Sequence, residues 1–259
     1  MMIKYILTLA SAGLFLLSGC NHEDVQHTQE ATGTLAVHFS RTGMTNGTAS
    51  DTESQITTLN AYRFENGILK ETFNSLQINE EGTCQLQIEQ RKGSLYFLAN
   101  STKVIAKENL QKDITTLNDF LKLTATSEEM TSENLLMGGK ANLNIESSSL
   151  SIALKRAVAR IDLDSPFQDA EVNSVIIKEI ALTGFVNEQD ANQSPEEFEK
   201  TSLTKDFGDQ PFKNGKTTLF YLPEQYTNGH DSMMVVFAKT LVFRHFRGRP
   251  CVKANKFIA

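Results

Sequence analysis

Tryptophan is absent from this 259-residue sequence, and cysteine occurs only at Cys20, Cys84 and Cys251. Glycan-binding proteins commonly stack exposed aromatic side chains, tryptophan above all, on sugar rings, so its absence weighs against a glycan-binding surface. The cysteines are too few for a disulfide framework, and we expect Cys84 and Cys251 to stay unpaired. The formal net charge of -6 argues against a nucleic-acid-binding protein.

Local motifs of catalysis and metal binding are also missing. The sequence has no Gly-x-Ser-x-Gly, Cys-x-x-Cys or His-Glu-x-x-His motif, and its histidines are scattered. The segment Gly138-Gly139-Lys140 lacks the spacing of a phosphate-binding loop, so we predict a turn there. The many carboxylates are not paired as a catalytic acid and base would be. The sequence therefore predicts no enzymatic activity, no cofactor and no metal site.

The beginning of the chain predicts export and lipid attachment. Lys4 precedes an apolar stretch, residues 5–17, that is too short to span a bilayer and is typical of a signal peptide. A Leu-Ser-Gly sequence then precedes Cys20, which is the lipobox pattern of bacterial lipoproteins. The alternative is an ordinary signal peptide followed by a chance cysteine. We predict that residues 1–19 are removed, and that acyl chains such as palmitate on Cys20 anchor the protein in a membrane.

Residues 20–33 are polar and predict a flexible, lipidated tether. Within it, Glu23 and Asp24 form an acidic pair that resembles the surface-export signal of Bacteroidetes lipoproteins. A plain solvated linker is the alternative. After Cys20 no stretch is apolar enough to predict a transmembrane helix.

From residue 34 onward, alternating apolar and polar residues rich in β-formers predict strands. The predicted strands are 34–40, 56–64, 68–73, 83–90, 93–100, 143–145, 150–154, 158–163, 172–183, 217–222 and 233–242. Asn66-Gly67 predicts a hairpin turn. Residues 93–100 are almost wholly apolar and therefore predict a central strand buried on both faces.

Helix signals are few. Apolar residues in 109–123 stand near helical spacing, whereas Thr116 and Asp119 suggest a cap for a shorter helix. Ser194-Pro195 predicts the start of another short helix. Many strands and few helices predict an all-β fold. Because one sandwich uses about 100 residues, we expect two tandem β-sandwich domains, 34–157 and 158–259, with a boundary near Lys155 to Arg160.

Five segments that follow the lipobox carry a family resemblance. They are ITTLNAYRFENG (56–67), LYFLAN (95–100), LLMGG (135–139), LKRAVARI (154–161) and FYLPE (220–224). In this order they resemble the fimbrillin-like proteins of Bacteroidales, which include FimA-type and Mfa-type subunits of type V pili and their anchor lipoproteins. The resemblance extends from about residue 20 to residue 225.

The resemblance implies a fold and a mode of assembly. It implies two transthyretin-like β-sandwich domains in a lipoprotein of the cell outer membrane, exposed at the surface or carried into a pilus. In polymerising members an arginine-directed protease removes the N-terminal strand, and a strand from a neighbouring subunit fills the groove by β-augmentation. The implied partners are the outer membrane through lipid on Cys20, other pilus subunits, and host or bacterial surface receptors.

Arg41 is the candidate site for this processing. It ends the predicted strand 34–40 and begins a loop of Thr, Gly and Asn residues, where proteolysis usually succeeds. Cleavage after Arg41 would free the strand, and a plain surface arginine is the alternative. Anchor members of the family are not cut.

The sequence departs from the family pattern after about residue 238. The remaining segment is basic, and no acidic residue follows Asp231. We expect a truncated or frame-shifted end, with a second sandwich that lacks closing strands; contact of the basic segment with lipid headgroups is an alternative.

Taken together, these observations predict a structural or adhesive cell-surface lipoprotein, either a fimbrial (pilus) subunit or an anchor, that assembles by strand exchange. The alternative is a surface glycan- or peptide-binding lipoprotein on the same kind of sandwich. A surface hydrolase is a third possibility, but the sequence offers no set of catalytic residues for it.

Overall fold

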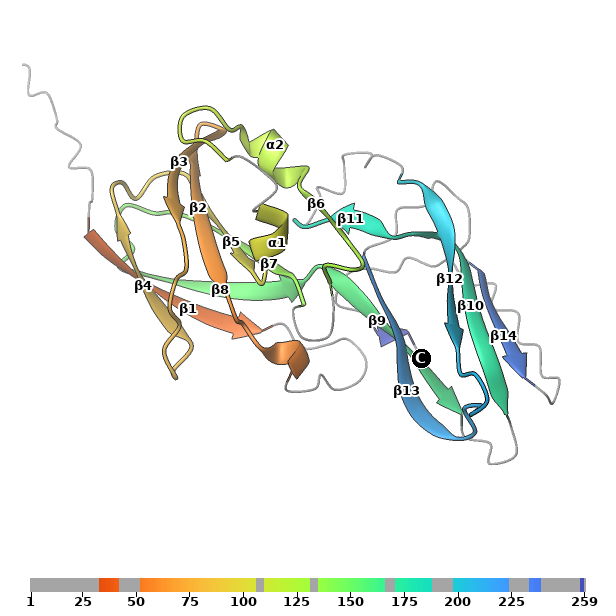
Figure 1. Ribbon diagram of the computed structural model, residues 1–259. Helices are drawn as coiled ribbons and strands as arrows, with labels where there is room; N and C mark the ends of the chain where they lie inside the picture. Colours follow the sequence, from red (N-terminus) through yellow and green to blue (C-terminus); the bar gives the residue numbers. More distant parts are fainter. Residues whose placement is uncertain are drawn as a thin grey trace, which may run out of the picture. The chain divides into compact units, whose positions relative to one another are not determined.

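The computed structural model describes residues 33–41, 52–105, 110–130, 135–165, 171–187, 198–223, 233–238 and 257–258. Most of these residues lie in β-strands, accompanied by a few short helices (Figure 1). The prediction of an all-β fold is confirmed. The described strands belong to one unit, Ala31–Ala259, and the domain boundary near Lys155 to Arg160 stays a prediction.

Seven strands form the larger sheet, in the order β3-β2-β5-β7-β8-β1-β4. Their bounds are Gly33–Arg41 for β1, Leu59–Glu65 for β2, Ile68–Phe73 for β3, Thr83–Ile88 for β4, Ser94–Ala99 for β5, Met137–Asn142 for β7 and Ser149–Arg156 for β8. The β2–β3 hairpin turns at Asn66 and Gly67, whose φ angles are 51° and 76°. Two successive positive φ angles are what a type I′ turn requires, which confirms the predicted hairpin.

The sheet folds back on itself between β7 and β8. These strands pair at Met137–Arg156 and Gly138–Lys155, near one end of each strand. Phe39 of β1 and Phe97 of β5 are not in neighbouring strands, yet their ring centroids are 5.2 Å apart. Strands β3-β2-β5-β7 therefore pack face to face with β8-β1-β4. The enclosed core consists of Leu35, Val37, Leu59, Ala61, Cys84, Leu86, Ile88, Leu95, Phe97, Ala99, Met137, Ile152 and Leu154.

The other face of β2 and β5 is also covered. Two short helices, α1 (Thr102–Ile105) and α2 (Leu117–Leu121), and strand β6 (Thr124–Thr126) lie in the segment that packs there (Figure 1). Phe120 of α2 is fully buried, and its ring lies 5.0 Å from Tyr62 and 5.1 Å from Phe64. The prediction that β5 is buried on both faces is thus confirmed.

A second group of strands follows β8. It contains β9 (Val158–Ser165), β10 (Val172–Ala181), β12 (Lys200–Asp206), β13 (Gly215–Pro223), β14 (Met233–Ala238) and β15 (Phe257–Ile258), in sheets ordered β12-β10-β14 and β13-β9-β15. Both sheets contribute to a core of Ile161, Val172, Val175, Ile177, Ile180, Leu219 and Leu222. Strand β11 (Thr183–Phe185) pairs instead with β6. We call the seven-stranded sheet, together with the turns and loops that connect its strands, the first strand group, and these two sheets the second strand group.

Two sequence predictions in the first strand group are wrong. Gly138-Gly139-Lys140 lies in β7 and not in a turn, because a Cβ atom at Gly139 would lie only 2.7 Å from Cγ2 of Ile152, so glycine there allows close packing. Residues 143–145 are not a strand. The side chain of Asn144 accepts a hydrogen bond from the amide of Glu146 at 3.1 Å, which favours a turn.

The long helix predicted over 109–123 is also wrong, and the shorter alternative is confirmed. Asp113 has a φ angle of 63°, and the amide of Leu69 donates to the carbonyl oxygen of Thr115, so this segment lies along β3. Helix α2 begins after Thr116, whose hydroxyl accepts from the amide of Asp119 at 3.1 Å. The predicted helix at Ser194-Pro195 lies outside the described residues.

Candidate functional site

Strand β1 is an inner strand of the first strand group (Figure 1). It pairs antiparallel with β4 on one side and parallel with β8 on the other. Its inward side chains Leu35 and Val37 have no exposed surface, whereas His38 and Ser40 point to solvent. The alternation predicted from the sequence therefore matches one buried and one exposed face.

The residues that β1 covers are mostly apolar. Leu35 lies opposite Leu86 and Val37 lies opposite Cys84 in β4, while Phe39 lies opposite Ile152 in β8. Departure of β1 would leave unpaired backbone groups on two strands, with an apolar floor between them. Such a groove is a template for another strand.

Cys84 is a free thiol in β4, at the side of this groove. Cys84 is 3% exposed, and burial raises the pKa of its thiol to about 11. The other two cysteines, Cys20 and Cys251, lie outside the described residues.

Arg41 is the last residue of β1. Its backbone is in register with Leu154 of β8, and the residues from 42 to 51 lie outside the described part of the chain. Arg41 thus marks the end of an inner strand, and its role in processing stays a prediction.

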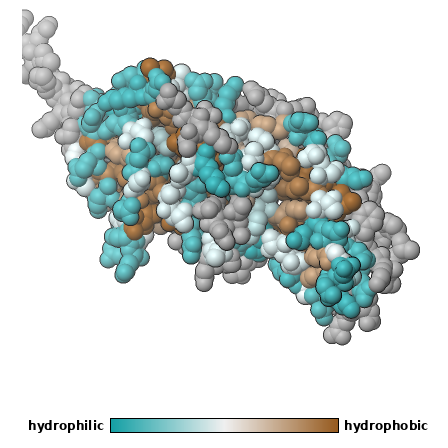
Figure 2. All heavy atoms as spheres, in the orientation of Figure 1, coloured by the Kyte–Doolittle hydropathy of each residue, from teal (hydrophilic) through white to brown (hydrophobic). Residues whose placement is uncertain are grey.

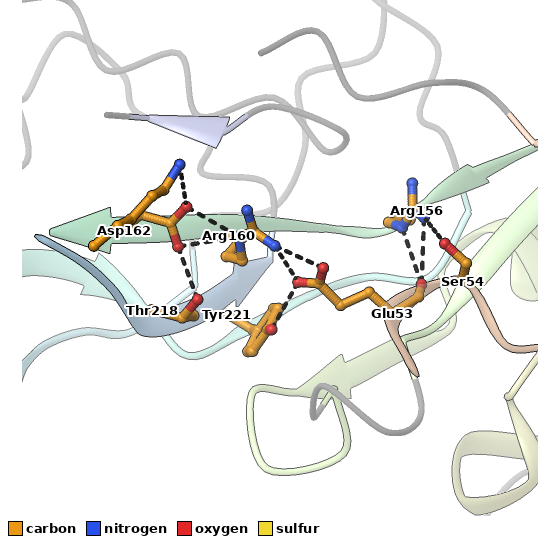
Figure 3. A network of polar contacts seen from close by, with 8 residues as sticks. Glu53, Ser54, Arg156, Arg160, Asp162, Thr218 and Tyr221 are labelled. Atoms are coloured by element: carbon orange, nitrogen blue, oxygen red, sulfur yellow. Dashed lines mark hydrogen bonds and ion pairs between the residues drawn. The ribbon is translucent and has the colours of Figure 1, made fainter. Parts of the chain in front are cut away.

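The chain is described again from the 3₁₀ turn Thr52–Ser54, where Glu53 is 1% exposed. Nη1 of Arg160, in β9, donates to both carboxylate oxygens of Glu53 at 2.8 and 2.6 Å, and the hydroxyl of Tyr221, in β13, donates to Glu53 Oε1 at 2.7 Å (Figure 3). We call Glu53, Arg160 and Tyr221 the Glu53 clasp. It joins the first strand group to the second.

Further polar contacts extend the clasp along β9 and β13. Nε of Arg160 lies 3.0 Å from Oδ1 of Asp162, which also accepts from the hydroxyl of Thr218 at 2.9 Å and lies 3.1 Å, through Oδ2, from Nζ of Lys216 (Figure 3). Burial lowers the pKa of Arg160, but the carboxylates of Glu53 and Asp162 raise it by more than burial lowers it. The net shift of this pKa is therefore upward. Burial and the bond to Glu53 raise the pKa of Tyr221. Arg160 is therefore charged and Tyr221 neutral at pH 7.

Arg156, at the end of β8, holds the backbone of the same turn. Its Nε and Nη2 donate to the carbonyl oxygen of Glu53, each at 3.3 Å, and Nη2 lies 3.4 Å from the hydroxyl of Ser54 (Figure 3). Both the carboxylate and the carbonyl of Glu53 are thus bound by arginines of the β8–β9 segment.

Asn100 fixes the residues that follow this turn. Its side-chain oxygen accepts from the amide of Thr57 at 2.8 Å, and its Nδ2 donates to the carbonyl oxygens of Gln55 and Leu135 at 2.9 and 3.0 Å. Asn100 ends the LYFLAN segment and adopts a φ of 59°, a conformation that asparagine tolerates better than most residues. It therefore links three segments of the first strand group.

The sequence contained no local signal for the Glu53 clasp. Glu53 and Arg160 are 107 residues apart, and Glu53 and Tyr221 are 168 apart. Arg160 and Tyr221 lie in segments that carried the family resemblance, but nothing in the sequence paired either residue with Glu53.

Within the described ranges, no group of three or more His, Cys, Asp or Glu residues is placed to hold a metal ion. None of the described helices is long and apolar enough to cross a membrane. Figure 2 shows mainly hydrophilic residues on the visible face, with separate apolar groups between them.

Solved structures show which fold this is. A fimbrial assembly protein from Parabacteroides distasonis aligns with a TM-score of 0.55 and 14% identity over 88% of this chain and 90% of that chain. Candidate cell adhesion proteins from Parabacteroides distasonis and Bacteroides eggerthii both align with a TM-score of 0.54 over 81% of this chain and 75% of theirs, at 17% and 12% identity. No family model and no curated protein matches the chain. The chain has a fimbrillin-like fold, and the predicted resemblance is confirmed at the level of the fold.

Proposed function

We propose that this protein is a structural or adhesive cell-surface lipoprotein, a pilus subunit or anchor that assembles by β-strand exchange. The observation that carries the proposal is the placement of β1. This first described strand is an inner strand whose apolar face includes the fully buried Leu35 and Val37, and its departure would open a groove between β4 and β8. The fimbrial and adhesion proteins of the same fold support the same role.

In this proposal the protein begins as a lipoprotein. The signal peptide, residues 1–19, is removed, and lipid on Cys20 holds the chain to the outer membrane through the tether of residues 20–33. The partners are the membrane, other subunits, and host or bacterial surface receptors. Replacement of Cys20 by Ser should abolish incorporation of labelled palmitate, and unchanged labelling would dismiss lipid attachment at this residue.

Release of β1 is the step that would expose the groove. Cleavage after Arg41 would separate β1 from the rest of the chain at the point where its pairing with β8 ends. A strand from a neighbouring subunit would then pair with β4 and β8 and place its apolar side chains over Cys84, Leu86 and Ile152. An anchor would keep β1 and its lipid.

The test is a blot of unheated outer-membrane extract from the native cell. A ladder of high-mass bands that collapses on boiling is expected for a strand-exchanged polymer. A single lipid-modified band would contradict polymerisation and leave the anchor role. Arg41→Lys keeps the charge but should block an arginine-directed protease. Arg91→Lys, at a partly exposed arginine that follows β4 and contacts the backbone of β1 at Thr34, should leave the mature N-terminus unchanged.

A further inference from the structure

The Glu53 clasp connects two strand groups through a buried carboxylate. Glu53 belongs to a turn of the first strand group, and both Arg160 and Tyr221 belong to the β9–β13 ladder of the second. The side chain of Glu53 is 1% exposed and that of Arg160 is 10% exposed. Hydrogen bonds to an ionised group are stronger than neutral ones, and they are screened little where water is excluded.

Charge balance makes Glu53 important to the second strand group. In the β9–β13 ladder, the carboxylate of Asp162, whose side chain is 2% exposed, contacts both Arg160 and Lys216. Glu53 supplies the second carboxylate that binds Arg160. Without Glu53, Arg160 would have to share Asp162 with Lys216, and breaking a buried ion pair is strongly destabilising.

We propose that the second strand group depends on Glu53 for its stability. Its β9–β13 ladder is stable only while Glu53 of the turn Thr52–Ser54 stays bound to Arg160 and Tyr221. The clasp is defined by residues outside β1. If the proposed strand exchange takes place, the clasp therefore keeps the second strand group attached after β1 has left. The stability dependence itself does not rest on the proposed function.

Hydrogen exchange of the mature full-length chain tests this dependence. Backbone amides of 158–165 and 215–223 report on the second strand group, and those of 59–65 and 94–99 report on the first. In Glu53→Gln, we expect the amides of β9 and β13 to exchange about tenfold faster than in the wild type, while those of β2 and β5 keep their rates. Equal acceleration in both groups, or none, would overturn the proposal.

Three further variants sharpen the test. Tyr221→Phe removes one hydrogen bond and leaves the ion pair, so it should accelerate exchange of the same amides by about threefold. If Glu53→Gln does not fold, this variant provides the test. Glu89→Gln removes a carboxylate that is 69% exposed, and it should change neither group. The double variant Glu53→Gln, Arg160→Gln should exchange more slowly than the product of the single effects predicts, because both single changes break the same ion pair. Additive single effects would contradict a coupled clasp.

The result of the hydrogen-exchange experiment is independent of the proposed function. A single monomeric band in the outer-membrane blot would refute polymerisation without altering these exchange rates. Conversely, wild-type rates in Glu53→Gln would refute the dependence even if the polymer ladder were present.

Discussion

The ring of Phe39 in β1 lies edge-on against the ring of Phe97 in β5, with centroids 5.2 Å apart and an interplanar angle of 78°. The two residues are 58 positions apart (97 − 39) and belong to opposite halves of the folded-back sheet. This contact ties the first described strand to the centre of the first core. Weakening β1 should therefore affect both stability and the exposure of that core.

Truncation of a buried side chain in β1 should measure how firmly the strand is held. Leu35 has no exposed surface, and Leu35→Ala should lower the free energy of unfolding by about 2–5 kcal/mol because it removes apolar contact and leaves a cavity. Ser40→Ala, on the exposed face of the same strand, should change it by less than about 0.5 kcal/mol. Urea titration of both variants checks this, and equal losses would contradict the assignment of the two faces.

The thiol of Cys84 should report departure of β1. It is buried opposite Val37, and its raised pKa keeps it protonated, so reaction with a disulfide reagent at pH 8 should be slow. In a background with Cys20→Ser and Cys251→Ser, adding Leu35→Ala should speed labelling at least about tenfold, because the strand opens more often. Ser40→Ala serves as the control with the unmodified rate. Equal labelling rates for the background protein, the Leu35→Ala variant and the Ser40→Ala variant would show that β1 does not protect Cys84.

The two adjacent glycines of β7 should respond differently to alanine. A Cβ at Gly139 would lie 2.7 Å from Cγ2 of Ile152, whereas the nearest atom to a Cβ at Gly138 is 3.5 Å away. We expect Gly139→Ala to destabilise the protein by about 1–3 kcal/mol, since overpacking forces neighbouring side chains to move. Gly138→Ala should stay within about 0.5 kcal/mol of the wild type. Thermal or urea unfolding distinguishes them, and a larger loss for Gly138→Ala would refute the orientation of β7.

Alkaline pH should destabilise the protein partly through Tyr62. Burial raises the pKa of Tyr62 from 10.0 to about 12. The folded state therefore keeps this proton longer than the unfolded state does, and the stability that Tyr62 contributes below pH 10 is lost as the pH rises from about 10 to about 12.

Tyr62→Phe removes this titration. Between pH 9 and pH 11 the wild type should lose about 1 kcal/mol of unfolding free energy more than the variant, as the raised pKa of Tyr62 implies. Urea titrations at pH 9, 10 and 11 measure the difference. Parallel pH profiles for the two proteins would show that Tyr62 ionises equally easily in both states.

Periodicity was enough to predict most of the strands. Strand β3 was predicted with its observed bounds, and β1, β4, β5, β9 and β13 within a few residues, because each has one face or two faces that must be apolar. Strand β12 was missed because its side chains are mostly exposed and its sequence, KTSLTKD, carries little apolar signal. Strand β7 was missed for a different reason: its glycines serve close packing against β8, and that neighbour is not visible in the local sequence.

The same limit applied to the site. Arg41 could be recognised as a strand end because alternation stops there. Glu53 could not be recognised, because an acidic residue in a polar segment has the same local pattern whether it is solvated or buried. Its burial becomes evident only when β9 and β13 bring Arg160 and Tyr221 to it.

The sequence by itself determined the all-β class and the Asn-Gly hairpin, because these depend on the conformational preferences and polarity of residues close together in the chain. It offered the short Thr116-capped helix only as one of two alternatives. Tertiary structure alone decided that β1 is an inner strand, that Gly139 must be small, and that Glu53 pairs with Arg160. These features depend on which distant segments meet, and the energy of a buried charge or of a close contact is set by the neighbours that the fold supplies.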